Sequence, residues 1–409
     1  MSKENSKDES HNVSSDEPKN GFWYFMTCIL FAITILATII ILRSRASDIE
    51  PIHVKTSSKN NRENRSRKKM TDRLCTREKL EEFKRIVYCK EEREEYWSRK
   101  RFDEVRTDML TRWESLDNGI VIYCQDNDDV ENAYVLCNLL KFYKSKTPIL
   151  LWSKEQIRID RVCDNTYTLC LRDELQSGSY SSKKQVNKFL ALYLSRMFTN
   201  ILYLDSHLRC VQNIDHLFDI KGNYFWNDYW KLNTNAKCYS IFPDTVIKRD
   251  TVYSTDAGQF LVHHPSCIDS LYKTYHVMYN DLHSIFPYPY SESGKDVLRI
   301  MNDILSISYQ TNLFSPGFIG YSIIGTRFES RAMTQYDVKG DLLFIHPKCQ
   351  ADEKDTSKQW NYHRRFKGFG TTSPPYQYPL YPVTGDYTTE EFNLDIEELC
   401  EKFRRQYPV

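Results

Sequence analysis

The stretch Asn200-Ile-Leu-Tyr-Leu-Asp-Ser-His207 decides the fold that this chain can adopt. Its four consecutive apolar residues, Ile201 to Leu204, predict a short buried strand that ends at Asp205. Ligands of open α/β sheets bind beyond the carboxyl ends of the strands, so Asp205 would face the usual binding crevice. A Mg²⁺ or Mn²⁺ ion on Asp205 and His207 could hold the phosphates of an activated donor. The alternative is that Asp205 only caps the next turn.

A second pattern upstream predicts a parallel sheet. Gly119 to Cys124 reads as a buried strand, Val130 to Tyr143 as a helix, and Pro148 to Trp152 as the next strand. Such a β-α-β unit implies a right-handed crossover and an α/β fold. Neither a G-x-G-x-x-G sequence nor a Walker A sequence occurs, so a bound metal is the natural substitute for a glycine-rich phosphate loop.

The strand that ends at Asp205 follows a predicted amphipathic helix, Lys183 to Phe198. Lys188 in this helix could lie at the solvent end or point at a phosphate. Further on, five aromatic residues surround Asp228 in the segment Tyr224–Trp230. These rings could stack on a sugar while Asp228 accepts hydrogen bonds from hydroxyl groups, or they could be a core cluster around one partnered carboxylate.

Polar residues also precede the apolar run Phe260 to Val262. Asp256, Gly258 and Gln259 could bring the backbone close to a ligand, or they could form an ordinary turn. Helices are predicted for Ile268–Tyr279 and after Asp296. Leu342 to His346 predicts another buried strand that ends at a metal ligand, and residues 351–409 predict a surface segment with one helix, Thr389–Arg404.

The N-terminal part predicts a membrane anchor. Phe22 to Leu42 contains 21 residues without charge, Gly or Pro, which at about 1.5 Å per residue just spans a bilayer core. Trp23 and Tyr24 suit the membrane interface. The predicted domains are a cytoplasmic tail (1–21), a transmembrane signal anchor (22–42), a stem (43–72), a helical neck (73–117) and a lumenal catalytic domain (118–409).

Charge and cysteine content limit the alternatives. The net charge is +1, so nucleic acid is not an expected partner. Residues 43–70 carry nine Lys and Arg against three acids, whereas residues 1–20 carry three Lys against five, which by itself would place the C-terminal side in the cytoplasm. Twelve Cys residues without zinc-ribbon or Cys-x-x-Cys spacing suit a lumenal domain with some disulfides, although cytosolic buried thiols are the alternative.

Six segments in this order resemble a known family. They are KFLALYLSRMFTNILYLDSH (188–207), FWNDYW (225–230), DAGQFLV (256–262), GKDVLRI (294–300), MTQYD (333–337) and LFIHP (343–347). Together they resemble the fungal Golgi α-mannosyltransferases of glycosyltransferase family 71, over roughly residues 118–350. The Gln after Gly258 and the Asp-Ser start of the metal motif look more like the α-1,2 branch than the α-1,3 branch.

The resemblance implies a set of site residues. Asp205, His207 and His346 would hold Mn²⁺, while Lys188, Asp205 and Lys295 would bind the GDP-mannose donor. The catalytic set would be Asp228, Asp256 and Gln259, which orient donor or acceptor hydroxyls. The chain departs from the family pattern at three of these places: His207 replaces the second carboxylate of the Asp-x-Asp motif, Asp256 stands where the family usually has Glu, and Ser293-Gly294 replaces Gly-Asp before Lys295.

The resemblance also implies a fold and a reaction. The family has a GT-A type nucleotide-sugar-binding fold with a mixed, mainly parallel sheet, behind a single-pass type II anchor and a stem in the Golgi membrane. Its members transfer mannose, with retention, from GDP-mannose to mannoside acceptors on N-glycans or cell-wall mannan, and a Golgi glycosyltransferase complex is an expected partner. The alternatives are an impaired relative that serves as a binding or regulatory subunit, and an unrelated anchored protein with a nucleotide-binding-like fold.

Overall fold

The computed structural model describes residues 77–88, 98–157, 165–175, 181, 183–231, 253–285, 296–323, 327–347, 362–366, 387–392 and 395–407. All of them belong to one compact unit, residues Thr71–Val409. The predicted tail, anchor and stem lie outside the described residues. Among the described residues, no helix is both long and apolar enough to cross a membrane.

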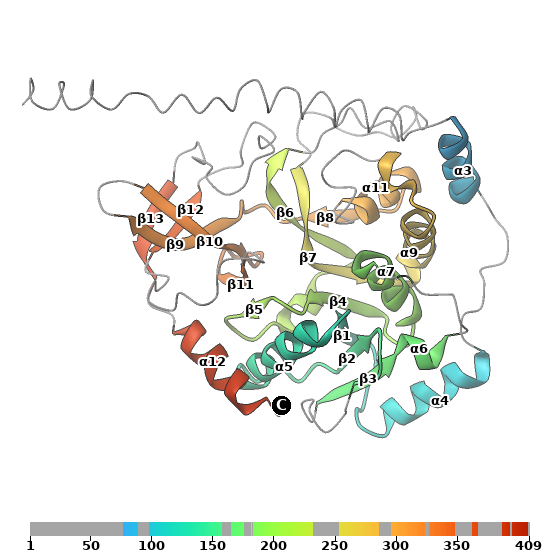
Figure 1. The fold of residues 1–409 in the computed structure, drawn as a ribbon, viewed down its shortest axis with the longest axis horizontal. Helices are drawn as coiled ribbons and strands as arrows, with labels where there is room; N and C mark the ends of the chain where they lie inside the picture. Colours follow the sequence, from blue (N-terminus) through green and yellow to red (C-terminus); the bar gives the residue numbers. More distant parts are fainter. Residues whose placement is uncertain are drawn as a thin grey trace, which may run out of the picture. The chain divides into compact units, whose positions relative to one another are not determined.

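The larger sheet has seven strands and is mostly parallel (Figure 1). The spatial order is β3 (Thr166–Cys170), β2 (Ile149–Ser153), β1 (Asn118–Cys124), β4 (Asn200–Asp205), β7 (Tyr253–His263), β6 (Asn223–Lys231) and β8 (Tyr309–Thr311). Strands β3, β2, β1 and β4 all run in one direction, β7 is antiparallel to β4, and β6 is parallel to β8. Because β1 and β4 are adjacent and parallel, Tyr123 lies beside Asp205.

This arrangement confirms the predicted α/β fold with a mixed, mainly parallel sheet. Strand β1, helix α5 (Asn127–Phe142) and strand β2 form the predicted β-α-β unit. The helix begins three residues earlier than its apolar pattern indicates, because the Asp126 side chain caps it and accepts a hydrogen bond of 3.0 Å from the Asp129 backbone N–H. Asp129 therefore lies in the first helical turn rather than in a loop.

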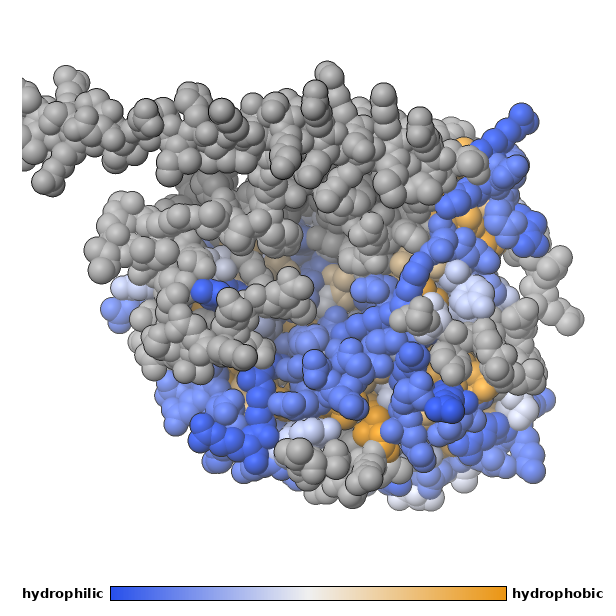
Figure 2. Space-filling model, viewed as in Figure 1, coloured by the Kyte–Doolittle hydropathy of each residue, from blue (hydrophilic) through white to orange (hydrophobic). Residues whose placement is uncertain are grey.

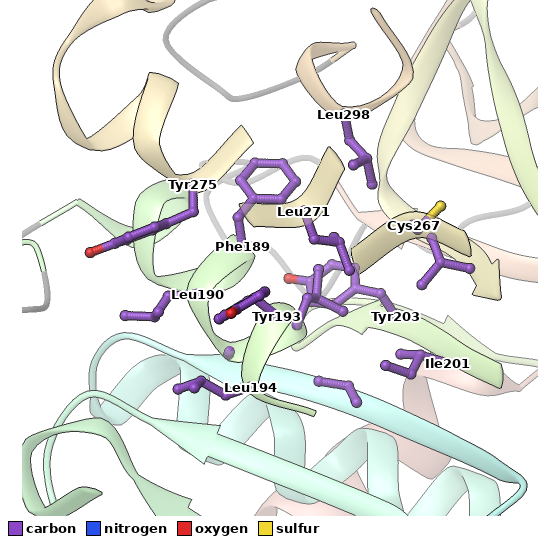
Figure 3. Close-up of a cluster of buried hydrophobic side chains, with 14 of the residues drawn as sticks. Phe189, Leu190, Tyr193, Leu194, Ile201, Tyr203, Cys267, Leu271, Tyr275 and Leu298 are labelled. Carbon is purple, nitrogen blue, oxygen red and sulfur yellow. The ribbon is translucent and has the colours of Figure 1, made fainter. Parts of the chain in front are cut away.

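Two hydrophobic layers cover the two faces of the larger sheet, because side chains alternate along each strand. On one face, Tyr203 and Ile201 of β4 pack against α7 (Lys184–Leu194), α9 (His264–Tyr279) and α11 (Val297–Ile304), as Figure 3 shows. On the other face, Leu202 and Leu204 pack with α5 and with residues of the second sheet. The strand that carries Asp205 is thus packed against hydrophobic residues on both faces.

The second sheet is a feature that the sequence pattern did not predict. It has six antiparallel strands and packs beside the larger sheet through Leu343 and Phe344. The spatial order is β13 (Tyr387–Glu391), β12 (Tyr362–Phe366), β9 (Gly317–Ile323), β10 (Arg327–Tyr336), β11 (Leu342–Pro347) and β5 (Arg209–Cys210). The predicted strand that ends at His346 is β11, and its pairing with β5 places it close to the end of β4.

Two helices of the predicted neck pack into the same core. Helix α3 (Arg77–Tyr88) buries Phe83 and Val87, and helix α4 (Arg99–Leu110) buries Val105 and Met109. Contacts between α3 and α9 join this region to the larger sheet. The remaining short elements are α6 (Leu171–Glu174), η2 (Asp215–Asp219), η3 (Leu282–Ile285) and the terminal α12 (Ile396–Gln406).

Two local predictions differ from the structure. The alternative of an ordinary turn around Asp256 is wrong, because this segment belongs to the long strand β7, whose pairing with β6 is interrupted by register shifts. The terminal helix begins only at Ile396, because Tyr387–Glu391 pairs with β12 as a strand. The β-branched pair Thr388-Thr389 favours this extended conformation.

The described cysteines are all buried free thiols: Cys124, Cys137, Cys170, Cys210, Cys267 and Cys400. The predicted disulfides are therefore not found among these six. On the face seen in Figure 2, hydrophobic residues form only small separate areas among hydrophilic ones.

Candidate active site

The candidate site lies where β1 and β4 end side by side. From β1 the chain continues through β2 and β3 on one side, whereas β4 lies on its other side, so the chain direction across the sheet reverses here. In open α/β sheets such a point is the usual place of a ligand crevice. The residues after β1 and those at the end of β4 meet at this edge, which brings Asp129 and Asp205 together although the sequence separates them widely.

Asp129 is a buried carboxylate with several hydrogen-bond donors. Its Oδ1 atom lies 2.5 Å from Lys184 Nζ, 2.8 Å from Ser206 Oγ and 3.1 Å from His207 Nε2. Its Oδ2 atom accepts a 2.9 Å hydrogen bond from the Gln125 backbone N–H. Burial opposes ionisation, but these contacts hold the pKa of Asp129 well below its ordinary value, so the carboxylate is charged.

Lys184 is shared between Asp129 and Asp205. Its Nζ atom lies 3.2 Å from Asp205 Oδ1, and the side chains of both residues are partly exposed. Burial acts against the charge on Lys184, yet the two carboxylates raise its pKa above the ordinary value. Burial also acts against ionisation of Asp205, but Lys184 and Lys188 lower its pKa. The end of β4 therefore carries an ionised carboxylate that is compensated by nearby cations.

Lys188 is a buried cation on the inner side of the same helix. Its Nζ atom donates a 3.2 Å hydrogen bond to the Ala257 carbonyl oxygen and lies 5.0 Å from the ring centroid of Tyr203 and 5.9 Å from that of Phe260. Burial lowers the pKa of Lys188 to about 8, while Asp205 acts in the opposite direction. Lys188 therefore points into the protein toward β4 and β7, not into solvent.

Asp256, from the predicted catalytic set, is held by several hydrogen-bond donors. Its Oδ1 atom accepts a 2.9 Å hydrogen bond from the Gly258 backbone N–H, and its Oδ2 atom accepts bonds from the side-chain amides of Gln259 (3.0 Å) and Gln335 (3.2 Å). His346 Nδ1 lies 3.4 Å from Oδ1. Burial opposes ionisation, but His346 and these donors keep the pKa of Asp256 far below its usual value. Asp256 is only 5% exposed and Gln259 is fully buried.

His346 connects this acid to the other carboxylates. Burial disfavours its charged form, but Asp256, Asp205 and Asp228 raise its pKa above the ordinary value. Asp228 on β6 is half-buried, so its carboxylate is more accessible than that of Asp256. The structure thus brings His346 near three of the predicted site residues.

Other predicted residues have structural roles or lie outside the described part. Tyr224, Phe225 and Trp226 are buried in the core, and Trp226 donates a hydrogen bond to the Tyr336 carbonyl oxygen, so these rings do not form a sugar platform. Asp296 accepts hydrogen bonds from Ser254 and Thr255 and thereby ties β7 to α11. Lys295 lies outside the described residues.

The predicted metal ligands are of a suitable kind, because carboxylate oxygen and imidazole nitrogen both bind Mn²⁺. In the structure, however, His207 faces Asp129, His346 faces Asp256, and Lys184 lies against Asp205. Within the described ranges, no group of three or more His, Cys, Asp and Glu side chains is gathered closely enough to hold a metal ion. A metal on Asp205 would therefore require these side chains to rearrange.

Three residues of the site were not singled out from the sequence: Lys184, Asp129 and Gln335. Lys184 is the first residue of α7, four positions before Lys188, so both lysines lie on one side of the helix. Asp129 could have been found only if β1 and β4 had been known to be neighbours, because the ends of neighbouring parallel strands share an edge. Gln335 offers no such signal, because it comes from the unpredicted second sheet.

A comparison with protein families gives a match over part of the chain. Residues 117–300 match the family model described as "Mannosyltransferase putative". This region includes Asp129, Lys184, Asp205 and Asp256, but not His346. A search of curated proteins gave no match. Among solved structures, the apo structure of the WbbM bifunctional glycosyltransferase is similar with a TM-score of 0.35 and 11% identity, over 49% of this chain and 39% of that one. The similarity thus spans about two fifths of the WbbM chain.

Proposed function

We propose that this chain is a retaining α-mannosyltransferase that moves mannose from GDP-mannose to a mannoside acceptor on an N-glycan or on mannan, with an α-1,2 linkage. The observation that carries the proposal is the position of Asp205. It ends a central strand at the switch point of the sheet, inside the region that matches the mannosyltransferase model, with two lysines beside it. This is where a GT-A type fold would bind the diphosphate of a nucleotide sugar.

The reaction breaks the bond between mannose C1 and the β-phosphate oxygen and forms a bond from C1 to the acceptor hydroxyl oxygen. GDP departs with the electron pair, and the hydroxyl proton passes to a base. Lys188, from its buried position behind Asp205, adds positive charge that helps to neutralise the donor phosphates, and Lys295 is a further donor-binding residue of the proposal. Mn²⁺ on Asp205, with His207 and His346, would supply additional neutralisation of the departing GDP.

Retention can follow two routes, a covalent glycosyl intermediate on a carboxylate or a front-face attack in which the leaving phosphate takes the acceptor proton. Asp228 is our choice for a carboxylate near the sugar, because it is half-buried whereas Asp256 is only 5% exposed. Asp256 and Gln259 orient the site, and Asp256 does so through its contact with His346.

The location that fits this function is the Golgi membrane, with residues 22–42 as a type II anchor and the described unit in the lumen, where a complex with other glycosyltransferases is the proposed partner. Protease treatment of sealed vesicles tests the orientation. We expect the C-terminal unit to be protected, and its digestion from the cytosolic side would contradict the proposal.

The activity test uses the detergent-solubilised full chain with GDP-mannose, Mn²⁺ and an α-mannobiose acceptor. We expect transfer by the parent, a loss of at least about a hundredfold in Asp205→Asn, and little change in Asp219→Asn, which alters an exposed carboxylate away from the site. Linkage analysis of the product distinguishes α-1,2 from α-1,3. Transfer by His207→Asp but not by the parent would instead indicate an impaired relative that acts as a binding subunit.

A further inference from the structure

Lys184 occupies the place beside Asp205 where the proposed function puts a metal ion. Its ammonium nitrogen lies 3.2 Å from Asp205 Oδ1 and 2.5 Å from Asp129 Oδ1. An ammonium group and a divalent cation repel each other strongly at such distances in a partly buried site. Lys184 and a metal therefore cannot both lie against this oxygen of Asp205.

The two carboxylates differ in what else they contact. Asp129 is buried and also has Ser206, His207 and the Gln125 backbone N–H as donors. Asp205 is partly exposed, and its other described contact is a long one of 3.4 Å from Ser206 Oγ. Asp205 can therefore exchange its cation, whereas Asp129 keeps Lys184 through the shorter contact.

We infer that Lys184 is an internal cation that competes with the divalent metal for Asp205. Without metal, the ammonium group bridges Asp129 and Asp205 and prevents the carboxylates from repelling each other. When a metal ion binds to Asp205, Lys184 withdraws onto Asp129, which the flexible lysine stem allows. The inference rests on the proposed function, because it assumes that the metal of that reaction binds at Asp205.

The consequence is a weakened apparent affinity for metal. A site whose binding-competent state is only partly populated binds its ligand more weakly by that fraction. Removing the competing ammonium group should therefore tighten metal binding, which is the opposite of what loss of an ordinary site residue does. This sign makes the inference testable without any measurement of turnover.

The experiment titrates Mn²⁺ into the solubilised full chain without donor and follows free Mn²⁺ by electron paramagnetic resonance. We expect Lys184→Met to bind Mn²⁺ at least tenfold more tightly than the parent, and Lys184→Arg, which keeps the charge, to remain close to the parent. Lys183→Met is the matched control. It removes a lysine from the same helix end, but one that pairs with Asp281 on the surface.

Lys184→Gln provides a second neutral variant in case Lys184→Met does not fold, because its amide can still donate to Asp129. Equal or weaker Mn²⁺ binding by the folded neutral variants, or no Mn²⁺ binding by any variant, overturns the inference. If the parent transfers mannose but Lys184→Met binds Mn²⁺ with the same affinity as the parent, the inference is refuted and the proposed function stands. Tighter binding by Lys184→Met in a chain that transfers no mannose would support the inference and refute the proposed function.

Discussion

A Cβ atom on Gly258 would lie 2.7 Å from Cε1 and 2.8 Å from Nδ1 of His346, so the imidazole packs directly against the backbone of β7. Even alanine at this position would push the ring away from its place. The glycine between Asp256 and Gln259 therefore makes room for a histidine of the second sheet, where the sequence had indicated close approach of a ligand.

The first prediction is that Gly258→Ala impairs the site through His346. The displaced ring can no longer keep its 3.4 Å contact with Asp256, so we expect transfer to fall by about 10- to 100-fold. The same substitution made in a His346→Ala background should have a much smaller effect, because the clash is absent. Equal losses in both backgrounds would show that Gly258 acts in some other way.

The second prediction concerns pH and Lys188. Burial lowers its pKa from 10.5 to about 8. Because the folded-state pKa is the lower one, the unfolded chain binds more protons between these values, and Lys188 makes the free energy of unfolding rise with pH across that window. Replacement by Met should remove this rise, which is at most about 1.4 kcal/mol per pH unit.

Urea unfolding of the parent and of Lys188→Met at pH 8 and at pH 10 measures this difference. Lys141→Met, which alters a lysine on the outer surface of α5, is the control. It should leave the free energy of unfolding close to that of the parent at both pH 8 and pH 10. The same slope in Lys188→Met as in the parent would mean that Lys188 is not the titrating group. A donor affinity that falls as pH rises through about 8 would be the functional counterpart.

The third prediction is that His207→Asp makes stability depend on metal. The imidazole that now lies 3.1 Å from Asp129 would be replaced by a carboxylate near Asp129 and Asp205. Without metal we expect a loss of about 1–2 kcal/mol, or a few degrees in Tm, from repulsion. Mn²⁺ should restore the lost stability, because a ligand that binds the folded state stabilises that state. Thermal unfolding with and without Mn²⁺ tests this, and a variant insensitive to Mn²⁺ would contradict it.

The fourth prediction concerns stability alone. A Cβ atom on Gly119 of β1 would lie 2.4 Å from the ring of Phe198, which is buried in the core. Gly119→Ala should therefore cost about 1–3 kcal/mol or more through overpacking. The double variant Gly119→Ala/Phe198→Leu should lose less free energy of unfolding than the sum of the losses in the two single variants, since the smaller side chain relieves the clash. Strictly additive losses in chemical unfolding would show that the two residues do not interact.

The elements that could be predicted are those whose local pattern and tertiary setting agree. The apolar runs before Asp205 and in β1 are buried on both faces, so composition alone identifies them. The polar residues around Asp256 interrupt the apolar pattern, so the sequence left open both a close approach to a ligand and an ordinary turn, whereas the partners Gln335 and His346 come from the second sheet. No local signal reveals such partners, because they are brought together only by the packing of two sheets.

The residues of the candidate site also differ in whether a local sequence signal reveals them. Asp205 could be placed from the end of its strand, and Lys188 from the helix before it. Lys184 and Asp129 could not be joined from the sequence, because the pairing of β1 with β4 alone makes them neighbours. The aromatic residues before Asp228 suggested a sugar platform, but in a strand between two packed layers they fill the core.

The hydrogen bond from Gln335 to Asp256 spans 79 residues of the chain. During synthesis, at about 5–20 residues per second, the buried carboxylate would be made several seconds before this partner leaves the ribosome. Until then, Asp256 has only its local donors Gly258 and Gln259, and its burial is opposed by the cost of desolvating an incompletely paired charge. We therefore expect nascent or prematurely terminated chains to keep this region open, where chaperones and proteases can recognise it, and the site to close only when translation is nearly complete.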